Sequence, residues 1–383
     1  MKKSTKKIKK KKIRIDFRNY WWHFNPENNI LINLLKKDYD VIIDKKNPDF
    51  VFFSVYDGKR PIQSKKYGKI GNKLENFSPL LYKLLREAYY FRKERWKMPI
   101  LKGDFVKIFF TVESAHPNME KCDWAFTHEY DEELKNPRHL RIPGYTFNAI
   151  KNPNEFVKKN QDIKKILERK EKFCVYICSN DVTFRNSFFK QLNKYKKVES
   201  WGKCLNNMGR GIPKLVEINS DIKSKGETKE HVERDFLGQY KFIIAFENAS
   251  NVGYTSERKS DPMRVNTIPI YWGNPLVHRD FNTKSFINYH DFERKVKKRI
   301  PVFFFKVPIL KFLTEKYVER ATFKKMIKRI IEIDQDDNLY MEMLKEPWYN
   351  DNKPPKYLDR GIIQKRLREI IEAGKKVRLI HKP

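Results

Sequence analysis

The chain has 383 residues, enough for two domains of ordinary size with separate cores. Its 40% hydrophobic and 14% aromatic content excludes a wholly disordered protein. Its formal net charge is +34, and nine of the first fourteen residues are Lys or Arg. A positive field of this size favours anionic partners, which include nucleic acids, membrane surfaces and phosphorylated small molecules. A lysine-rich composition with solvated surface lysines would give the same charge.

The sequence contains no apolar run of the roughly 18 residues that a membrane-spanning helix needs, and no secretory signal. Cys174 and Cys178 lie four residues apart in a predicted strand, about 13 Å from each other, so we expect buried thiols and no disulfide. The eight histidines lack the spacing of a structural zinc site. The aspartates at 38–40 and 334–337 do not follow predicted strands. We therefore expect no protein-bound catalytic metal.

Residues 1–12 are predicted to be a disordered, basic tail. Beyond them, short apolar runs alternate with helical patterns. In the first half, strands are predicted over 13–20, 41–43, 50–55, 106–112, 124–127 and 140–142, and helices over 27–37 and 74–95. After a polar segment at 151–171, strands are predicted over 173–178, 198–201, 242–246 and 268–272, and helices over 185–195, 309–344 and 362–373.

Strands that alternate with helices indicate parallel sheets covered by helices, so the fold class is α/β. We predict one such domain over 13–160 and a second over 161–345, followed by a basic helical tail over 346–383. Ligand sites favour domain interfaces and the carboxyl ends of parallel strands. We therefore expect a ligand site in a cleft between the two domains.

The stretch 239–273 is the most informative part of the chain. Its first strand ends at Glu247-Asn248, a polar loop follows, and a second apolar run closes at Gly273. In the loop, Glu257 could bind sugar hydroxyls and Arg258 could bind phosphate oxygens. Each residue alone would be an ordinary surface residue. Together, between two buried strands, they indicate a binding site.

Two further clusters follow predicted strands. Arg185 opens a helix, where the free backbone N–H groups and the partial positive charge also favour phosphate. Glu113 and His116 lie just beyond a strand of the first half, where a carboxylate facing a cleft can act as a general base. Motifs typical of P-loop proteins, dinucleotide-binding folds, α/β-hydrolases and zincins do not occur.

The segment QYKFIIAFENASNVGYTSERKSDPMRVNTIPIYWGNP strongly resembles the donor-binding signature of the α1,3/4-fucosyltransferases. The upstream runs Trp201-Gly-Lys-Cys204 and Phe184-Arg-Asn186 fit the same family, as do Lys284-Ser-Phe-Ile-Asn288 and His290-Asp-Phe292 downstream. In the first half, Thr111-Val-Glu-Ser114 resembles the acceptor-domain segment. The resemblance is dense over 173–292 and sparse but ordered over 13–145.

The resemblance implies a GT-B architecture, in which two Rossmann-like domains face each other across a cleft. It implies inverting transfer of L-fucose from GDP-β-L-fucose to the 3-OH of GlcNAc, or of glucose, in an N-acetyllactosamine-like glycan. Glu113 would be the general base, and GDP-fucose would be a co-substrate, with no required metal or other cofactor. The donor-binding residues would be Arg185, Gly202, Lys203, Asn248, Tyr254, Ser256, Glu257 and Arg258, and the acceptor-binding residues would be His116 and Trp22.

Three residues depart from the family pattern. Arg258 stands where the family usually has lysine, and Ser256 where it has threonine. Arginine keeps the charge but changes its reach and hydrogen-bond geometry, which bears on the preference for GDP-fucose. Pro262 should fit only near the start of a helix, so we expect altered helix packing beside the donor.

Two alternatives stay open: an inverting transferase that uses another nucleotide sugar, and a basic nucleic-acid-binding protein. No motif supports the second, so we expect no nucleic-acid partner, although the basic tails could bind an anionic membrane surface. Eukaryotic members of the family carry an amino-terminal membrane helix that this sequence lacks. We therefore expect a cytoplasmic, membrane-peripheral enzyme of bacterial or viral origin.

Overall fold

The computed structural model describes residues 10–21, 24–57, 60–61, 96–146, 152–178, 182–209 and 235–377. The chain divides into two compact units, and each is described by itself. Unit 1 comprises Met1–Ile150 and Lys356–Pro383, and unit 2 comprises Lys151–Pro355. The helix predicted over 74–95 lies outside the described residues, as does most of the predicted basic tail.

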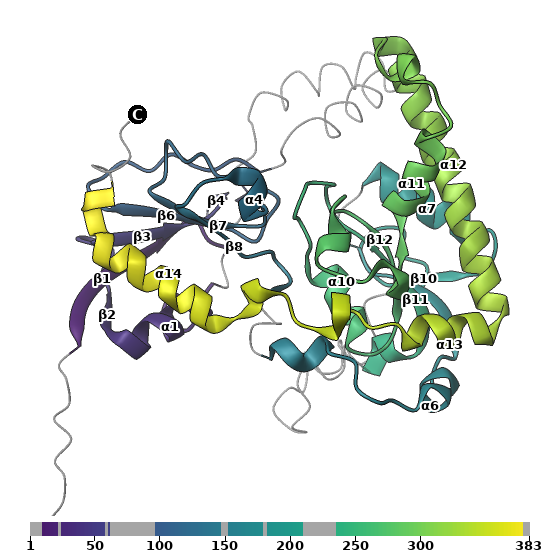
Figure 1. Ribbon diagram of the computed structural model, residues 1–383, viewed down its shortest axis with the longest axis horizontal. Helices are drawn as coiled ribbons and strands as arrows, with labels where there is room; N and C mark the ends of the chain where they lie inside the picture. The colour runs from purple at the N-terminus through teal and green to yellow at the C-terminus, as the bar shows by residue number, and fades with distance from the viewer. Residues whose placement is uncertain are drawn as a thin grey trace, which may run out of the picture. The chain divides into compact units, whose positions relative to one another are not determined.

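Unit 1 is built on a sheet of six parallel strands in the order β2-β1-β3-β6-β7-β8 (Figure 1). Its strands β3 and β7 are buried along their whole length, as apolar runs predict for strands covered on both faces. A two-stranded antiparallel pair, β4 and β5, follows β3. The strands are β1 Lys11–Arg18, β2 Tyr39–Ile43, β3 Phe50–Phe53, β4 Tyr56–Asp57, β5 Arg60–Pro61, β6 Val106–Phe110, β7 Trp124–Thr127 and β8 His139–Arg141.

The predicted disorder of residues 1–12 is wrong at its end. Lys11 and Lys12 belong to β1 and lie in register with Tyr39 and Asp40 of β2. Pairing with β2 satisfies their backbone groups while both lysine side chains stay exposed to solvent. A run of lysines therefore does not prevent a strand whose neighbour is already in place.

Among the described residues of unit 1, the helices are α1 Ile30–Asp38, α4 Asp131–Leu134 and α14 Arg360–Ala373, with the 3₁₀ turns η6 Lys356–Leu358 and η7 Gly374–Lys376 beside α14. Asn29 caps α1 by accepting a hydrogen bond from Ile32 N. Helix α14 packs beside α1 (Figure 1). Arg368 binds the Asp38 carboxylate through Nε at 2.7 Å and Nη2 at 2.9 Å. The carboxyl-terminal helix, predicted to be part of a separate tail, thus folds with unit 1.

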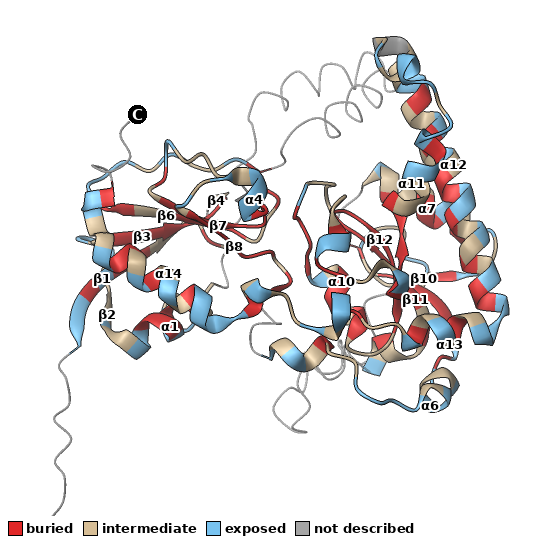
Figure 2. Cartoon of the chain, viewed as in Figure 1, coloured by how far each residue is buried: buried red, intermediate tan, exposed pale blue. Residues whose placement is uncertain are grey.

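Unit 2 is built on five parallel strands in the order β10-β9-β11-β12-β13. Cys174, in β9, and Cys178, two residues beyond its end, are buried and form no disulfide, as predicted. The strands are β9 Lys172–Tyr176, β10 Val198–Ser200, β11 Tyr240–Phe246, β12 Ile268–Trp272 and β13 Ile287–Asn288. The strands and the inner faces of the surrounding helices form its buried core, while the outer helix faces are exposed (Figure 2).

The helices of unit 2 are α6 Ile163–Glu168, α7 Thr183–Leu192, α10 Glu257–Met263, α11 Tyr289–Lys297, α12 Pro308–Gln335 and α13 Asp337–Lys345. The 3₁₀ turns are η1 Pro153–Phe156, η2 Val277–Arg279, η3 Thr283–Ser285, η4 Val302–Phe305 and η5 Asn350–Asn352. The single pattern over 309–344 is divided at Asp336, whose side chain caps α13. Across the described segments, none of the helices combines the length and apolar character that a membrane crossing requires.

The strand order locates the functional end of each sheet. In both units the first strand along the chain lies between the second and the third. Successive strands are therefore added first on one side of it and then on the other. This reversal falls between β1 and β3 in unit 1 and between β9 and β11 in unit 2. Ligands of open α/β sheets bind at such a switch point, outside the carboxyl ends of the strands. The predicted fold class, two Rossmann-like domains with parallel sheets, is confirmed.

Candidate active site

Arg185 lies at the switch point of unit 2. It is in the first turn of α7, which follows β9, and its side chain is fully buried. Its Nη1 donates to the carbonyl of Phe246 at 3.3 Å and to Asn248 Oδ1 at 3.1 Å, both at the exit of β11. Burying a guanidinium is costly unless it is well bonded, so this side chain is held in one position. Arg185 and Asn248, predicted separately, are therefore brought together.

Glu247 and Ser256 fasten the loop between β11 and α10. Glu247 is fully buried and accepts hydrogen bonds from Ser256 N at 2.7 Å and Ser256 Oγ at 2.6 Å. Burial raises the pKa of Glu247 to about 7, although the bonds from Ser256 oppose the rise. Gly273 is required here, because a Cβ would lie 2.3 Å from Glu247 Cγ. Sequence reasoning missed the role of Glu247, although its place at the end of a strand was a signal.

Arg258 approaches the same switch point from α10. The Ser256 hydroxyl caps this helix by accepting from Arg258 N at 3.3 Å. The Arg258 Nη1 donates to the carbonyl of Ile177, just after β9, at 3.4 Å. Arg185 and Arg258 thus bond to backbone that leaves β11 and β9, the two strands that flank the switch point.

The expectation that Pro262 fits only near a helix start is wrong. Pro262 is the penultimate residue of α10 and is buried. Proline has no backbone N–H to donate to the preceding turn of the helix. Because the helix ends one residue later, at Met263, the loss of this one hydrogen bond disturbs only its last turn. Pro262 accepts hydrogen bonds from Val265 N at 3.2 Å and Thr267 N at 3.0 Å, which turn the chain into β12.

Four other predicted donor residues differ in their exposure. Tyr254 is buried, and its carbonyl accepts from the Tyr271 hydroxyl at 3.4 Å. Gly202 lies against the end of β9, where a Cβ would be 2.1 Å from the carbonyl oxygen of Cys178. Lys203 and Glu257 are exposed. Tyr254 and the half-buried Gly202 shape this end of the sheet, whereas Lys203 and Glu257 are accessible to a ligand.

Lys259 is a fully buried lysine that was not predicted as a site residue. Its Nζ lies 3.8 Å from the ring centroids of both Phe281 and Phe286. Burial holds the pKa of Lys259 well below its ordinary value. An ammonium group between two aromatic faces is stabilised by cation–π attraction. The position directly after Arg258 was the only sequence signal for it.

Glu113 lies near the switch point of unit 1. It is half-buried, and the Tyr56 hydroxyl donates a short hydrogen bond to its Oε1. Glu113 N donates to Thr111 Oγ1 at 3.2 Å, and Tyr56 N donates to the carbonyl of Asn19, after β1, at 2.9 Å. These bonds link the ends of β6, β3 and β1. A carboxylate positioned in this way can accept a proton from a bound hydroxyl.

Aromatic side chains surround this edge of unit 1. Tyr20 and Phe24 stack with their ring centroids 4.0 Å apart. Trp21 and Trp96 each lie 6.1 Å from the ring of Tyr56, the residue that bonds Glu113. Such rings provide an apolar wall with a polar tip at Tyr56. Trp22, the predicted acceptor residue in this segment, lies outside the described residues.

His116, the other predicted acceptor residue, is held by Glu129. The distance from His116 Nδ1 to Glu129 Oε1 is 2.5 Å, and Glu129 is buried while His116 is half-exposed. Burial raises the pKa of Glu129, but His128, His116 and Thr127 together lower it to about 2. The side chain of His128 is fully buried beside it. Glu129 was also missed, since nothing in its spacing set it apart.

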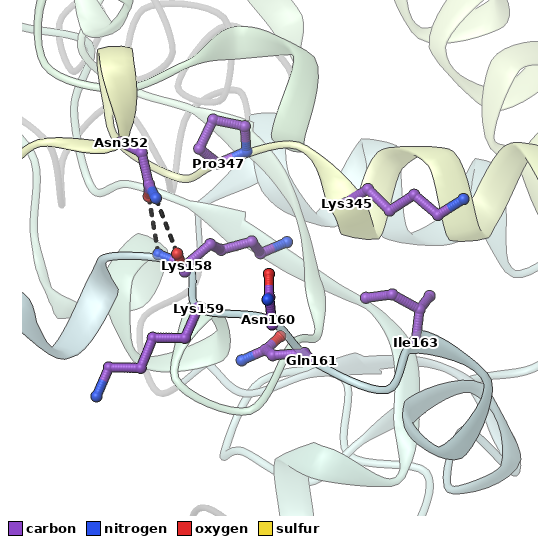
Figure 3. Close-up of a pocket in the computed structure, with 8 residues that line it drawn as sticks. All are labelled: Lys158, Lys159, Asn160, Gln161, Ile163, Lys345, Pro347 and Asn352. Atoms are coloured by element: carbon purple, nitrogen blue, oxygen red, sulfur yellow. Dashed lines mark hydrogen bonds between the residues drawn. The ribbon is translucent and has the colours of Figure 1, made fainter.

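A pocket of about 470 Å³ in unit 2 contains none of these residues (Figure 3). Lys158 and Asn352 exchange two backbone-to-side-chain hydrogen bonds of 2.8 Å at its wall. The Lys158 ammonium lies 4.3 Å from the ring of Trp348 and donates to the carbonyl of Leu344. These contacts connect the segment before α6 to the segment after α13. The pocket lies where the two segments meet, and its contacts are structural.

The chain matches two models of one protein family. Residues 167–302 match the carboxyl-terminal model of glycosyltransferase family 10 (fucosyltransferase), and residues 15–81 match the amino-terminal domain model of α-(1,3)-fucosyltransferase FucT. The two segments are those that hold most of unit 2 and the first strands of unit 1. The chain belongs to glycosyltransferase family 10.

Individual relatives agree with this assignment. The α-(1,3)-fucosyltransferase FucT of Helicobacter pylori is 31% identical over 217 residues, which are 49% of this chain and 41% of the relative. The GDP-fucose protein O-fucosyltransferase 3 of Xenopus tropicalis is 37% identical over 93 residues, 24% of this chain and 18% of the relative. The chain therefore spans less than half the length of these curated relatives.

The fold as a whole resembles that of a solved enzyme. A crystal structure of an α1,3-fucosyltransferase with GDP-fucose superposes with a TM-score of 0.59 at 23% identity, covering 97% of this chain and 94% of that one. The crystal structure of an α1,3-fucosyltransferase with GDP gives 0.60 at the same identity, over 97% and 93% of the two chains. The architecture of two parallel-sheet units is that of these structures, consistent with GT-B.

Proposed function

We propose that this protein transfers L-fucose from GDP-β-L-fucose, with inversion, to the 3-OH of GlcNAc or glucose in a β-galactoside-containing glycan. The observation that carries the proposal is the pair of guanidinium groups, Arg185 and Arg258, at the switch point of a family 10 domain. Two fixed cations at the carboxyl edge of a parallel sheet suit a pyrophosphate, to which guanidinium groups bond strongly.

On the donor side, Arg185 and Arg258 would bind the pyrophosphate of GDP-fucose. As the fucosyl bond breaks, the leaving GDP gains negative charge, which fixed cations stabilise without a metal ion. Asn248 and the Phe246 carbonyl already orient the Arg185 guanidinium, which is fully buried and would become accessible when the donor displaces the side chains that cover it. The remaining donor contacts are proposed to come from Gly202, Lys203, Asn248, Tyr254, Ser256 and Glu257.

On the acceptor side, Glu113 would remove the proton of the acceptor hydroxyl. The acceptor oxygen then forms a bond to the anomeric carbon while the bond from that carbon to GDP breaks, and its electron pair leaves with GDP. Attack opposite the leaving group converts the β-linked donor into an α-linked product. Tyr56 would orient the Glu113 carboxylate through its hydroxyl. Such general-base assistance typically contributes about 100- to 10,000-fold.

The acceptor class has one rival with support of its own. A relative that matches 24% of the chain is a protein O-fucosyltransferase, so a peptide hydroxyl is the second candidate acceptor. The glycan is favoured because the relative that matches 49% of the chain is an α-(1,3)-fucosyltransferase. The aromatic wall beside Glu113 suits the apolar face of a sugar ring. Another nucleotide sugar stays the alternative donor, because Arg258 replaces the family's lysine.

The remaining partners are part of the same proposal. The +34 charge favours an anionic membrane surface at the basic tails, and no nucleic acid is expected to bind. A cytoplasmic location and a bacterial or viral origin also stay predictions. Vesicle flotation with and without anionic lipid would test the membrane contact, which predicts binding only to the anionic vesicles and its loss at high salt.

The proposed activity is tested by mass spectrometry of the product. The full chain is incubated with GDP-fucose and an N-acetyllactosamine or lactose acceptor in the presence of a chelator. We expect a product heavier by one fucosyl group, with an α1,3 linkage. Parallel reactions contain GDP-mannose or UDP-galactose, or a peptide acceptor. Transfer only from another nucleotide sugar, or only to the peptide, would contradict the donor or the acceptor assignment respectively.

A further inference from the structure

Three side chains of the metal-ligating kind gather on unit 1 where β7 ends. His128 and Glu129 directly follow the strand, and His116 comes from the loop after β6. One ligand atom from each lies within 4.8 Å of the other two. We propose that His116, His128 and Glu129 form a binding site for a divalent transition-metal ion of the zinc class. This proposal concerns binding and does not depend on the proposed transfer activity.

The chemistry of the three donors selects the kind of ion. Imidazole nitrogen and carboxylate oxygen bind zinc at about 2.0–2.2 Å, so neighbouring ligand atoms lie roughly 3–3.5 Å apart around the ion. The distance from His116 Nδ1 to Glu129 Oε1 is 2.5 Å, and that from His128 Nδ1 to Glu129 Oε2 is 3.8 Å. Side-chain movements of about an ångström would bring these ligand atoms to the spacing found around zinc. Calcium and magnesium prefer oxygen ligands throughout, so two imidazoles disfavour them.

The carboxylate in the centre of the cluster is held in place by residues behind it. The hydroxyl of Thr127 donates to Glu129 Oε2, and its oxygen is 2.8 Å from Nε2 of His139. The other ring nitrogen of His139 is 2.7 Å from Asp131 Oδ1. The backbone carbonyl of His128 accepts from Arg141 Nε at 3.2 Å. Outer contacts of this kind orient ligating side chains in metal proteins and sustain their affinity.

The exposure of the three side chains provides a route for the ion. The side chain of His128 is fully buried and that of Glu129 is 9% exposed, whereas that of His116 is 39% exposed. An ion would therefore enter past His116 and retain one coordination position toward solvent, as in sites with three protein ligands. The competing interpretation is a His116–Glu129 ion pair that stabilises the loop and binds no metal. Direct binding measurements separate the two.

An ion at this site would have a consequence for activity. His116 is three residues from Glu113 and is a predicted acceptor contact. Coordination would fix the His116 ring on the metal and remove it from the acceptor. Zinc-class ions would then inhibit transfer at concentrations that fill the site, while a chelator would leave the basal reaction intact. The ion is thus an inhibitor or a structural ligand, and the proposed reaction does not require it.

The experiment uses the full, untagged chain after treatment with a chelator. Zn²⁺ is titrated by calorimetry, and Co²⁺ is titrated while its visible absorption is followed. We expect one equivalent to bind and Co²⁺ to show the bands of a site with few ligands. H116A and E129Q should weaken binding by about 10- to 100-fold or more, because a ligand matters at least as much as an outer contact. H116D should recover part of the affinity, since it restores a ligand.

The control is H278A, which removes an exposed histidine from unit 2. It should change the affinity less than twofold. Circular dichroism verifies that each variant is folded, and H116A is the safest because His116 is half-exposed. Equal affinity of H116A, E129Q and the unchanged chain would overturn the proposal. So would an equal loss in H278A, or no binding of either ion to the unchanged chain.

Discussion

The two units share one scaffold, yet the carboxyl edges of their sheets carry opposite chemistry. Both sheets are parallel and reverse their strand order beside the first strand. In unit 1 this edge holds Glu113, Glu129 and a group of aromatic rings, whereas in unit 2 it holds Arg185 and Arg258. The fold thus determines where a site can form, and the residues that follow the strands determine what it binds.

The units also differ in how they hold their charged groups. Arg185 is fully buried and bonds to a backbone carbonyl, so the donor edge is rigid before ligand arrives. Glu113 is half-buried and is held by a hydroxyl, so its carboxylate remains accessible. A binding site gains from a fixed cation, and a base needs access to the proton that it removes. The following predictions use this difference.

The largest effect is expected from Glu113→Gln. Removing the base should lower kcat by about 100- to 10,000-fold, because the acceptor hydroxyl then loses its proton acceptor. Glu113 belongs to unit 1, so the affinity for GDP should change less than twofold. Steady-state kinetics and GDP calorimetry measure the two quantities. Undiminished kcat in this variant would remove Glu113 from the mechanism.

The next prediction concerns Glu247 and the pH dependence of stability. Its pKa is raised from 4.5 to about 7 in the folded state, so the folded protein binds the extra proton. The protonated carboxyl therefore stabilises the fold fully below pH 4.5, and this stabilisation is lost as the pH rises toward 7. At about 1.4 kcal/mol per pKa unit, the free energy of unfolding should fall by on the order of 3 kcal/mol. Glu247→Gln stays neutral and should not show this loss.

Chemical denaturation of both proteins between pH 5 and pH 8 measures the effect. The free energy of unfolding of the unchanged chain should fall relative to that of Glu247→Gln. Glu293→Gln is the control. His290 and Lys297 outweigh burial and lower the pKa of Glu293. The contribution of Glu293 to stability therefore varies with pH only below the ordinary range of a carboxyl group. Parallel pH curves for the unchanged chain and Glu247→Gln would show that Glu247 is ionised when folded.

Arg185→Ala should weaken GDP binding by about 10- to 100-fold, because hydrogen bonds to charged groups contribute roughly 1.5–3 kcal/mol. It should also lower stability, since Asn248 and the Phe246 carbonyl lose a donor. Calorimetry with GDP and thermal unfolding measure both effects. Arg294→Ala removes an arginine that is 56% exposed and should alter neither. Equal GDP affinity in the two variants would contradict the donor assignment.

The smallest effect is expected from Gly202→Ala. A Cβ at Gly202 would lie 2.1 Å from the Cys178 carbonyl oxygen, so the loop must move away from β9. Overpacking of this kind costs about 1–3 kcal/mol, and we expect a several-fold rise in the KM for GDP-fucose. Gly238→Ala, whose Cβ would meet only Val265 at 3.8 Å, is the matched control. An unchanged KM would show that this loop does not contact the donor.

The sequence predicted the strands well because buried parallel strands read as continuous apolar runs. The runs at 124–127 and 268–272 match β7 and β12 residue for residue. The sequence could not assign α14 to unit 1, because that contact depends on Asp38, more than 300 residues before Arg368. Glu113 and Arg185 could be predicted as site residues from the sequence, because each is a charged residue that follows a predicted strand. Glu129 and Glu247 also follow strands, but their roles could not be predicted, because those roles come from partners that folding brings to them.

The most direct test of the central claim is a crystal structure of the protein soaked with GDP-fucose. The claim is that the switch point of unit 2 binds the donor. It predicts the pyrophosphate within hydrogen-bond distance of the guanidinium groups of Arg185 and Arg258, beyond the ends of β9 and β11. Clear density for the nucleotide at any other place, with this edge holding only solvent, would contradict the account.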